Sequence, residues 1–249
     1  LAWYLSLLGA RIRQIWWFAL TFVLAGIPIL LILEQPNLGT AMTLVPLTLV
    51  MLFTAGCRWW HMGLVALAAL AVVPLLFWQL HDFDPTLTRE EVRALPATEW
   101  YELEWYQKLR IYAFLNPEAD PQGSGWQTRQ SMISVGSGGM TGKGYLQSTQ
   151  TPLNYLPEHH TDFIFSLFAE EHGFVGGAAL IALFGLLLMR GTQFARESRD
   201  MHGTLLCVGA VTVLFFHIFV NIAITIGLMP VTGIPLPFLS FGGNFYLTT

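Results

Sequence analysis

The sequence predicts an all-α polytopic membrane protein, because it is too apolar for a soluble domain and contains several apolar runs of spanning length. Hydrophobic residues make up 54% and charged residues 11% of the 249 positions, whereas ordinary soluble domains carry about 25% charged residues. The apolar runs occupy 17–33, 41–56, 62–80, 173–189 and 203–229. Each is near the ~20 residues that a spanning helix needs, so we expect five membrane helices.

The first three runs each contain a proline, Pro28, Pro46 or Pro74. An internal proline frees a carbonyl group, which membrane helices tolerate where neighbouring helices satisfy it. The prolines therefore predict kinked helices packed in a bundle.

Six arginines fall in alternate connections between the runs: Arg11, Arg13, Arg58, Arg190, Arg196 and Arg199. Short loops rich in arginine face the cytoplasm, so the long segment between the third and fourth runs is predicted to be extracytoplasmic. The chain then divides into membrane helices with short links at 1–80, a long extracytoplasmic loop at 81–162, and further helices of the same membrane domain at 163–249.

Charge and cysteine content exclude some classes of function. The net charge is −4 and the basic residues are scattered, which argues against a nucleic-acid partner. Cys57 and Cys207 lie far apart in apolar surroundings, so we interpret both as packing residues rather than metal ligands or a disulfide. The chain begins with Leu1 and stops abruptly at Thr249, and we expect the natural protein to be longer.

A cluster of ionisable residues stands where the long loop enters the fourth apolar region: Glu158, His159, His160 and Asp162. Ionisable groups at membrane depth usually face a cavity or a partner. If a helix starts near Asp162, then Asp162, Ser166 and Glu170 share one side of it and line one water-filled pocket. A partly desolvated carboxylate in such a pocket is suited to act as a general base.

Two other interpretations of this cluster stay open. Thr161 or Asp162 caps the helix equally well on spacing alone. The histidines and carboxylates are also donors for a divalent cation, but adjacent loop residues often point apart. We therefore predict no metal site and leave a divalent cation open as a cofactor.

The glycine-rich run at 134–150 contains Lys143. Its backbone amides are suited to hold phosphate oxygens, and a tight structural turn explains the pattern equally well, because no Walker motif is present. Lys108, Arg110 and Arg129 are individually expected to snorkel or to pair with local acids. His217 and Asn221 share one helix face, which favours hydrogen bonds within the bundle over a polar path.

Several segments resemble one known family. The stretch LPEHHTDFIFSLFAEEHGFVGG matches the pattern LPExHTDFIF followed by EExGFxG, and EQPNLGTAM, NPEADPQGSGWQTRQSMISVGSGGMTGKG and GLMPVTGIPLPFLSFGG extend the match over nearly the whole chain. These motifs resemble the SEDS family (shape, elongation, division and sporulation). The GKG of 142–144 followed by Thr149 and Gln150 is similar to its RodA-like elongation branch.

The resemblance implies a SEDS-type multi-helix bundle and a peptidoglycan glycosyltransferase that polymerises lipid II during cell elongation. It implies that Asp162, in the HTDF motif, is the essential catalytic residue, and our hypothesis is that it acts as the base. For substrate binding we expect Lys143 first and then Arg110 to offset charge on undecaprenyl pyrophosphate, with further contacts from Lys108, Gln130, Glu158 and His160. A class B penicillin-binding protein is the implied partner in the bacterial cytoplasmic membrane. The alternatives are a flippase for lipid-linked precursors and a non-catalytic scaffold that activates this partner.

The chain also departs from the family pattern. Residues 84–104 resemble an insertion, Ser148 stands where glycine is usual, and Asn244 replaces a small hydroxyl residue. The family's first helices, which carry a PSExxK motif, are absent. We therefore expect the isolated chain, as the C-terminal portion of a RodA-like protein, to be inactive.

Overall fold

The computed structural model describes residues 1–35, 38–81, 84, 105–116, 123–149 and 162–240, and all the regular elements in these ranges are helices. The elements are α1 (Ala2–Leu8), η1 (Gly9–Arg13), α2 (Ile15–Leu33), α3 (Leu38–Thr54), α4 (Trp59–His81), α6 (Trp105–Leu115), α7 (Ser124–Ser137), α8 (Ile164–Glu197) and α9 (Met201–Thr225). The predicted all-α fold is confirmed.

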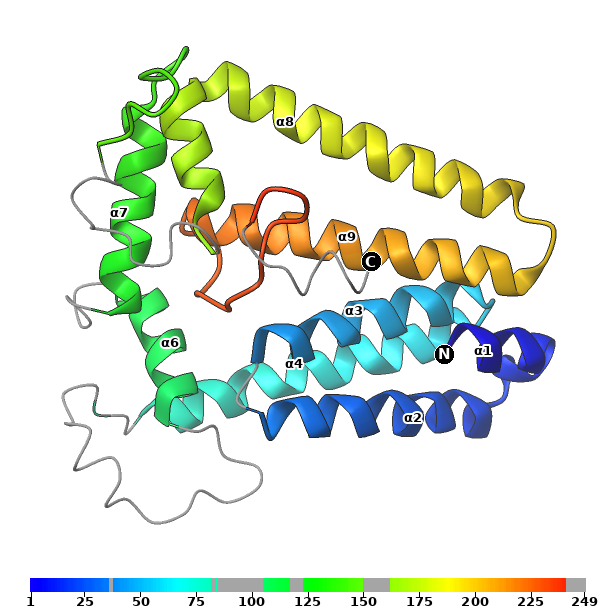
Figure 1. The fold of residues 1–249 in the computed structure, drawn as a ribbon. Coiled ribbons are helices and arrows are strands. Elements are labelled where there is room, and N and C mark those ends of the chain that lie inside the picture. Colours follow the sequence, from blue (N-terminus) through cyan, green and yellow to red (C-terminus); the bar gives the residue numbers. More distant parts are fainter. Residues whose placement is uncertain (36–37, 82–83, 85–104, 117–122, 150–161, 241–249) are drawn as a thin grey trace.

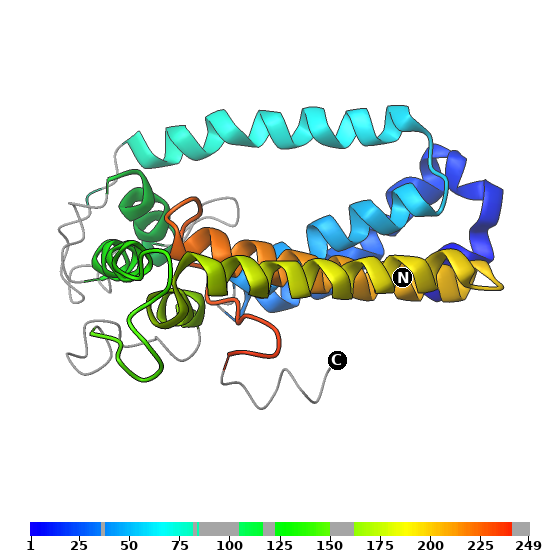
Figure 2. The same cartoon turned by 90° about the horizontal axis from the view of Figure 1, so that it is seen from above.

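The long helices run side by side, and two shorter helices cross one end of them (Figure 1). Helices α8 and α9 form an antiparallel pair, and α3 packs on both α9 and α2. Helix α4 lies at one side of the bundle, where its main contacts are with α3 and α6 (Figure 2). Helix α7 packs against α8, α9 and α6, so α6 and α7 close the left-hand end in Figure 1.

The five predicted spans all coincide with helices. Three of these, α2, α8 and α9, are long and apolar enough to cross a membrane, whereas α3 and α4 contain shorter apolar stretches, Gly39–Thr54 and Trp59–Leu75. Large apolar side chains stand exposed on the outer faces, among them Leu30 at 64% and Leu67 at 66%. Such a surface is stable only in an apolar solvent, which supports a bilayer around these helices.

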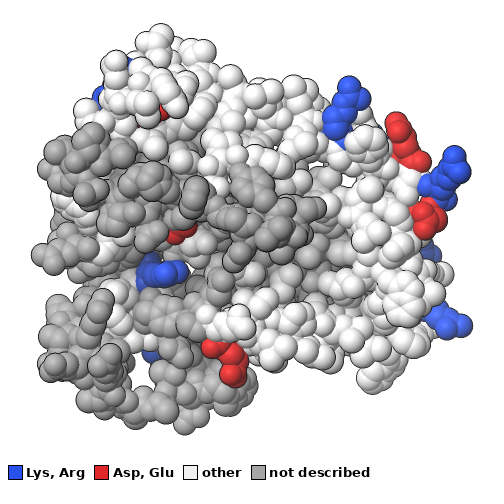
Figure 3. Space-filling model, viewed as in Figure 1, with Lys and Arg blue, Asp and Glu red and all other residues white. Residues whose placement is uncertain are grey.

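The prediction that the six arginines lie at one end of the membrane helices is confirmed. Arg11 and Arg13 belong to η1, Arg58 lies between α3 and α4, and the other three lie at the end of α8 or in the turn after it. These links all meet at the right-hand end of the molecule in Figure 1, where Figure 3 shows a group of charged side chains. The opposite end carries the start of α8, the end of α9 and helices α6 and α7.

Pro28, Pro46 and Pro74 lie inside α2, α3 and α4, and the kinks predicted at them stay a prediction. The buried core is divided along the bundle axis. One cluster joins α1, η1, α2, α3 and α9 and includes Leu5, Ile12 and Leu52. Two more clusters surround Phe163 and Phe165 at the start of α8. This end of the bundle is therefore well packed around the predicted site.

Candidate functional site

Asp162 lies in a turn just before α8, which begins at Ile164 and therefore two residues later than predicted. The residue at the N-cap is Phe163, and no side-chain hydrogen bond caps the helix there. Phe163 is fully buried in a cluster with Val220 and Ile224 of α9. Its burial anchors the start of α8 to α9, and the adjacent Asp162 is only half-buried.

Asp162 lies next to the segment that follows α9. The side-chain amide of Asn221 donates to the Asp162 carbonyl at 3.0 Å and to the Ile234 carbonyl at 2.8 Å. Oδ2 of Asp162 lies 3.8 Å from where a Cβ on Gly233 would stand. The Asp162 carboxylate and Gly233 are therefore neighbours, although 71 positions separate them in the chain.

The segment 227–240 is not helical. Pro230, Pro235 and Pro237 cannot donate backbone hydrogen bonds, so its buried carbonyls need donors from elsewhere. His217 forms a hydrogen bond with the Pro235 carbonyl, one residue from the carbonyl that Asn221 binds. The interpretation of His217 and Asn221 as groups that hold the bundle together is thus confirmed for these contacts.

The glycine-rich segment fills a kink in α8. At the kink Gly173 adopts φ 65° and ψ −167°, which breaks the regular helical hydrogen bonds. Backbone amides of Lys143 and Gly144 donate to the carbonyls of Glu170 and Glu171, both at 3.0 Å.

On the other side of the kink, the amides of Phe174 and Val175 donate to the carbonyls of Gly139 and Met140. These pairings satisfy the backbone groups that the kink frees, and the turn interpretation of this run fits them directly. A Cβ on Gly138 would clash with the Ala169 carbonyl. The close approach of the two backbones therefore needs glycine.

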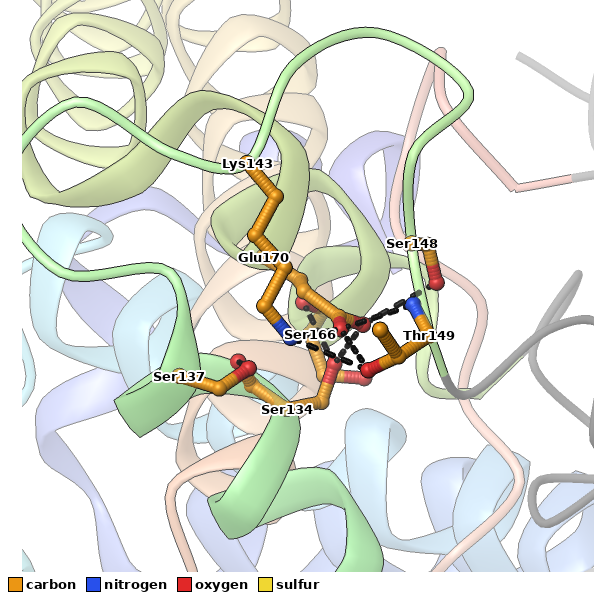
Figure 4. A network of polar contacts seen from close by, with 7 residues as sticks. All are labelled: Ser134, Ser137, Lys143, Ser148, Thr149, Ser166 and Glu170. Carbon is orange, nitrogen blue, oxygen red and sulfur yellow. Dashed lines mark hydrogen bonds and ion pairs between the residues drawn. The ribbon is translucent and has the colours of Figure 1, made fainter.

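Glu170 lies at the centre of a buried polar network (Figure 4). Its Oε1 accepts hydrogen bonds from the Lys143 ammonium at 2.6 Å, the Thr149 amide at 3.0 Å and the Thr149 hydroxyl at 2.7 Å. Its Oε2 accepts from the hydroxyls of Ser134 at 2.8 Å and Ser148 at 3.0 Å. The network joins α7, the glycine-rich segment and α8.

The predicted water-filled pocket lined by Asp162, Ser166 and Glu170 is wrong for the two helical residues. Ser166 and Glu170 are both fully buried, and the Ser166 hydroxyl donates to the Phe163 carbonyl at 2.6 Å. The helical spacing correctly places them on one face. That face, however, packs against α7 instead of facing water, because Ser134 of α7 bonds to the Glu170 carboxylate and the Ser166 carbonyl.

The remaining predicted binding residues that the structure describes lie on α6 and α7. Arg110 of α6 lines a small cavity of about 50 Å³ with residues of α7 and the segment after α9. Lys108 is on the same helix, and Gln130 is buried on α7. Glu158 and His160 lie outside the described residues, as do residues 85–104 of the proposed insertion and most of the candidate divalent-cation cluster.

Sequence reasoning did not identify the contact between Asn221 and Asp162, or the three hydroxyls around Glu170. Single serine residues carry no periodic pattern, so no local signal distinguishes the buried Ser134 and Ser148 from solvent-facing residues. The apolar surroundings of Asn221 in α9 did signal a buried partner, but they did not indicate which group it binds.

Comparison with known proteins assigns the family. The model of the family described as "Cell cycle protein", which covers FtsW, RodA and SpoVE, matches residues 1–249. The peptidoglycan glycosyltransferase MrdB of Escherichia coli (strain K12) is 39% identical over 226 residues, which are 90% of this chain and 55% of MrdB. The peptidoglycan glycosyltransferase RodA of Treponema pallidum is 34% identical and is 64% covered. The chain thus spans little more than half the length of MrdB.

Solved structures give the same result. A chain from a peptidoglycan synthase complex that coordinates polymerization and crosslinking matches 97% of this chain and is itself 61% covered, with a TM-score of 0.70 and 32% identity. An aspartate-to-alanine mutant of the rod shape determining protein RodA of Thermus thermophilus matches 96% of this chain and is 57% covered, with a TM-score of 0.55 and 26% identity. The chain belongs to the FtsW, RodA and SpoVE family, which is the SEDS family that its motifs resemble.

Proposed function

We propose that the full-length protein carrying this chain is a peptidoglycan glycosyltransferase that polymerises lipid II into glycan strands. The observation that carries the proposal is the place of Asp162: a half-buried carboxylate at the end of the bundle opposite the arginines, next to Gly233. The matched relatives MrdB and RodA bear the name of this activity.

In the proposed reaction, Asp162 accepts the proton from the 4-hydroxyl of the N-acetylglucosamine of one lipid II. That oxygen forms a bond to the anomeric carbon of the growing strand, and the bond from this carbon to undecaprenyl pyrophosphate breaks. A positioned carboxylate contributes as a general base, and holding two membrane-anchored substrates in one place supplies a further part of the rate.

A cation is needed where charge develops on the leaving pyrophosphate. We keep Lys143 as the first candidate and Arg110 as the second, with Lys108, Gln130, Glu158 and His160 as further substrate contacts. The Lys143 ammonium has three N–H donors, and two are directed at Glu170 and Thr149. One donor is left for a phosphate oxygen, and the Lys143 side chain is 27% exposed. A divalent cation stays open as an additional source of positive charge.

The same proposal sets the orientation and the partner. The arginine-bearing end faces the cytoplasm by the positive-inside rule, so Asp162 and the long loop lie on the outer side of the bacterial cytoplasmic membrane. One matched structure belongs to a complex that couples polymerization to crosslinking, which supports a class B penicillin-binding protein as the partner.

The flippase and scaffold alternatives receive less support. The flippase hypothesis depended on polar residues inside α9, and these bind the segment after α9: Asn221 binds Ile234, and His217 binds Pro235. Both alternatives are outcomes of the test below.

The test is glycan-strand formation from purified lipid II in detergent by the full-length protein and its Asp162→Asn variant, with and without the partner transpeptidase. We expect polymer from the parent and none from an equally folded variant. Equal polymer from both removes Asp162 as the base. The absence of polymer from the parent, even with partner and divalent cation, contradicts the proposal and favours transport or scaffolding.

A further inference from the structure

Asn221 is fully buried in α9 and joins three segments that are distant in sequence. Through one side-chain nitrogen it binds the carbonyl of Asp162, before α8, and the carbonyl of Ile234, in the segment after α9. A single amide group thus ties the turn that carries Asp162 to the segment that faces the carboxylate.

Both carbonyl groups lie outside regular helix. Helix α8 begins only at Ile164, and the carbonyl of Phe163 is the first to accept backbone hydrogen bonds from within it, from Ser166 and Leu167. The carbonyl of Ile234 precedes Pro235, in a segment with three prolines and no regular pairing. Side-chain donors are therefore needed at both places, and Asn221 supplies one to each.

The position of the Asp162 carboxylate depends on this link. Its Oδ2 lies beside Gly233, the residue that directly precedes Ile234. One hydrogen bond of Asn221 therefore holds Asp162 itself, and the other holds the residue next to Gly233. Moving either segment by an ångström changes the distance between the carboxylate and anything bound next to Gly233. Such misplacements cost up to about a hundredfold in rate.

We propose that Asn221 is a positioning residue for Asp162: its side-chain amide holds the catalytic turn against the Thr232–Gly233–Ile234 segment. This inference depends on the proposed role of Asp162 as the base. Asn221 does not touch the reacting atoms, so its effect falls on the rate of the chemical step and not on the binding of lipid II.

Two control variants separate this role from general support of the fold. His217→Leu removes the hydrogen bond to Pro235 on the same segment without touching Asp162. Ser131→Ala removes a buried hydrogen bond of 2.9 Å to the Thr225 carbonyl, one turn further along α9. Both loosen the same end of the bundle and leave the link to Asp162 in place.

The experiment measures lipid II polymerisation by the full-length protein with its partner, at a temperature where circular dichroism shows each variant folded. For Asn221→Leu we expect kcat to fall by about tenfold or more, with KM within about twofold of the parent. Both controls should retain a kcat within about threefold of the parent. An equal loss of kcat in His217→Leu and Asn221→Leu, or a change only in KM, overturns the inference.

A second variant serves if Asn221→Leu does not fold. Asn221→Asp keeps the shape, and its carboxyl group donates a hydrogen bond only when protonated. The kcat of Asn221→Asp relative to the parent should therefore fall as the pH rises, and parallel pH profiles overturn the inference. If Asp162→Asn remains active, the proposed base fails. If it is inactive while Asn221→Leu keeps the kcat of the parent, only the positioning role fails.

Discussion

The ammonium of Lys143 lies 2.6 Å from Oε1 of Glu170, whose side chain is fully buried, while that of Lys143 is 27% exposed. Hydroxyl donors occupy both carboxylate oxygens as well. A buried charge is tolerated only when it is paired and hydrogen-bonded in this way. The pair therefore connects the glycine-rich segment to the kinked start of α8, and this contact is already formed without a substrate.

Removing the cation should destabilise the protein more than removing the pair. Lys143→Met leaves the Glu170 carboxylate buried without its counter-charge, which costs about 3–5 kcal/mol, whereas replacing both partners by apolar residues recovers much of this loss. The unfolding midpoint in detergent should be highest for the parent, lower for the double variant Lys143→Met with Glu170→Leu, and lowest for Lys143→Met alone. Arg196→Met is the control, because Arg196 is an exposed cation on α8, the helix that carries Glu170. A midpoint for Lys143→Met equal to that of Arg196→Met contradicts the structural role of the pair.

The kink of α8 should not accept side chains on the glycines that fill it. Gly142 has φ +82°, and a Cβ there would clash with the Glu171 carbonyl. Gly142→Ala should therefore lower the free energy of unfolding by more than about 1 kcal/mol. Gly185 lies in α8 with open space around it, so Gly185→Ala should be neutral or stabilising by about 0.5–1 kcal/mol. Equal unfolding midpoints for the two variants would count against the kink.

Ser148 is a departure from the family pattern with a definite contact. Its hydroxyl donates to Oε2 of Glu170 at 3.0 Å, which a glycine at this position cannot do. Ser148→Gly should cost about 1–3 kcal/mol, because the acceptor is charged and buried. Ser137→Ala is the control, since the exposed Ser137 hydroxyl binds a carbonyl of its own helix. Thermal unfolding of both variants decides whether the hydroxyl of Ser148 contributes to stability.

A methyl group at Gly233 should slow polymerisation. Gly233 has φ +77°, and its Cβ would stand 3.8 Å from Oδ2 of Asp162. Gly233→Ala thus strains the segment and fills space beside the proposed base, so we expect kcat to fall by about tenfold or more. Gly63→Ala provides the comparison, because a Cβ on Gly63 of α4 meets nothing. Unchanged polymerisation by a folded Gly233→Ala variant would show that substrate does not approach Asp162 from this side.

Cys57 offers a test of orientation and of pH dependence. It lies between α3 and α4 at the arginine-bearing end, and burial raises the pKa of its thiol above the ordinary value. Only the thiolate reacts with maleimides, so labelling should be slow at neutral pH and should still increase above pH ~9.

In a Cys207→Ser background, a membrane-impermeant maleimide should label Cys57 from the cytoplasmic side only. The denatured protein, in which the pKa of Cys57 returns to its ordinary value, should react faster at neutral pH. Labelling from the outer side would reverse the proposed topology.

The predicted helices followed from local properties of the sequence. Apolar runs of spanning length form helices because lipid leaves each backbone group no other partner, and this located α2, α3, α4, α8 and α9. The start of α8 lies outside the apolar run: the helix begins at Ile164, near the expected start at Asp162, and directly after Phe163, which is buried against α9.

By itself the sequence determined the helical fold, the end of the bundle at which the arginines gather, the family and the candidate base Asp162. Tertiary structure alone decided that Glu170 pairs with Lys143 and is closed off from water, and that Asn221 ties Asp162 to Ile234. Helical periodicity tells which side chains share a face, but the element that covers the face is set by contacts between distant segments. Because Ser134 on α7 covers that face, Glu170 lies in a polar network closed off from water, while Asp162 before α8 stays partly exposed.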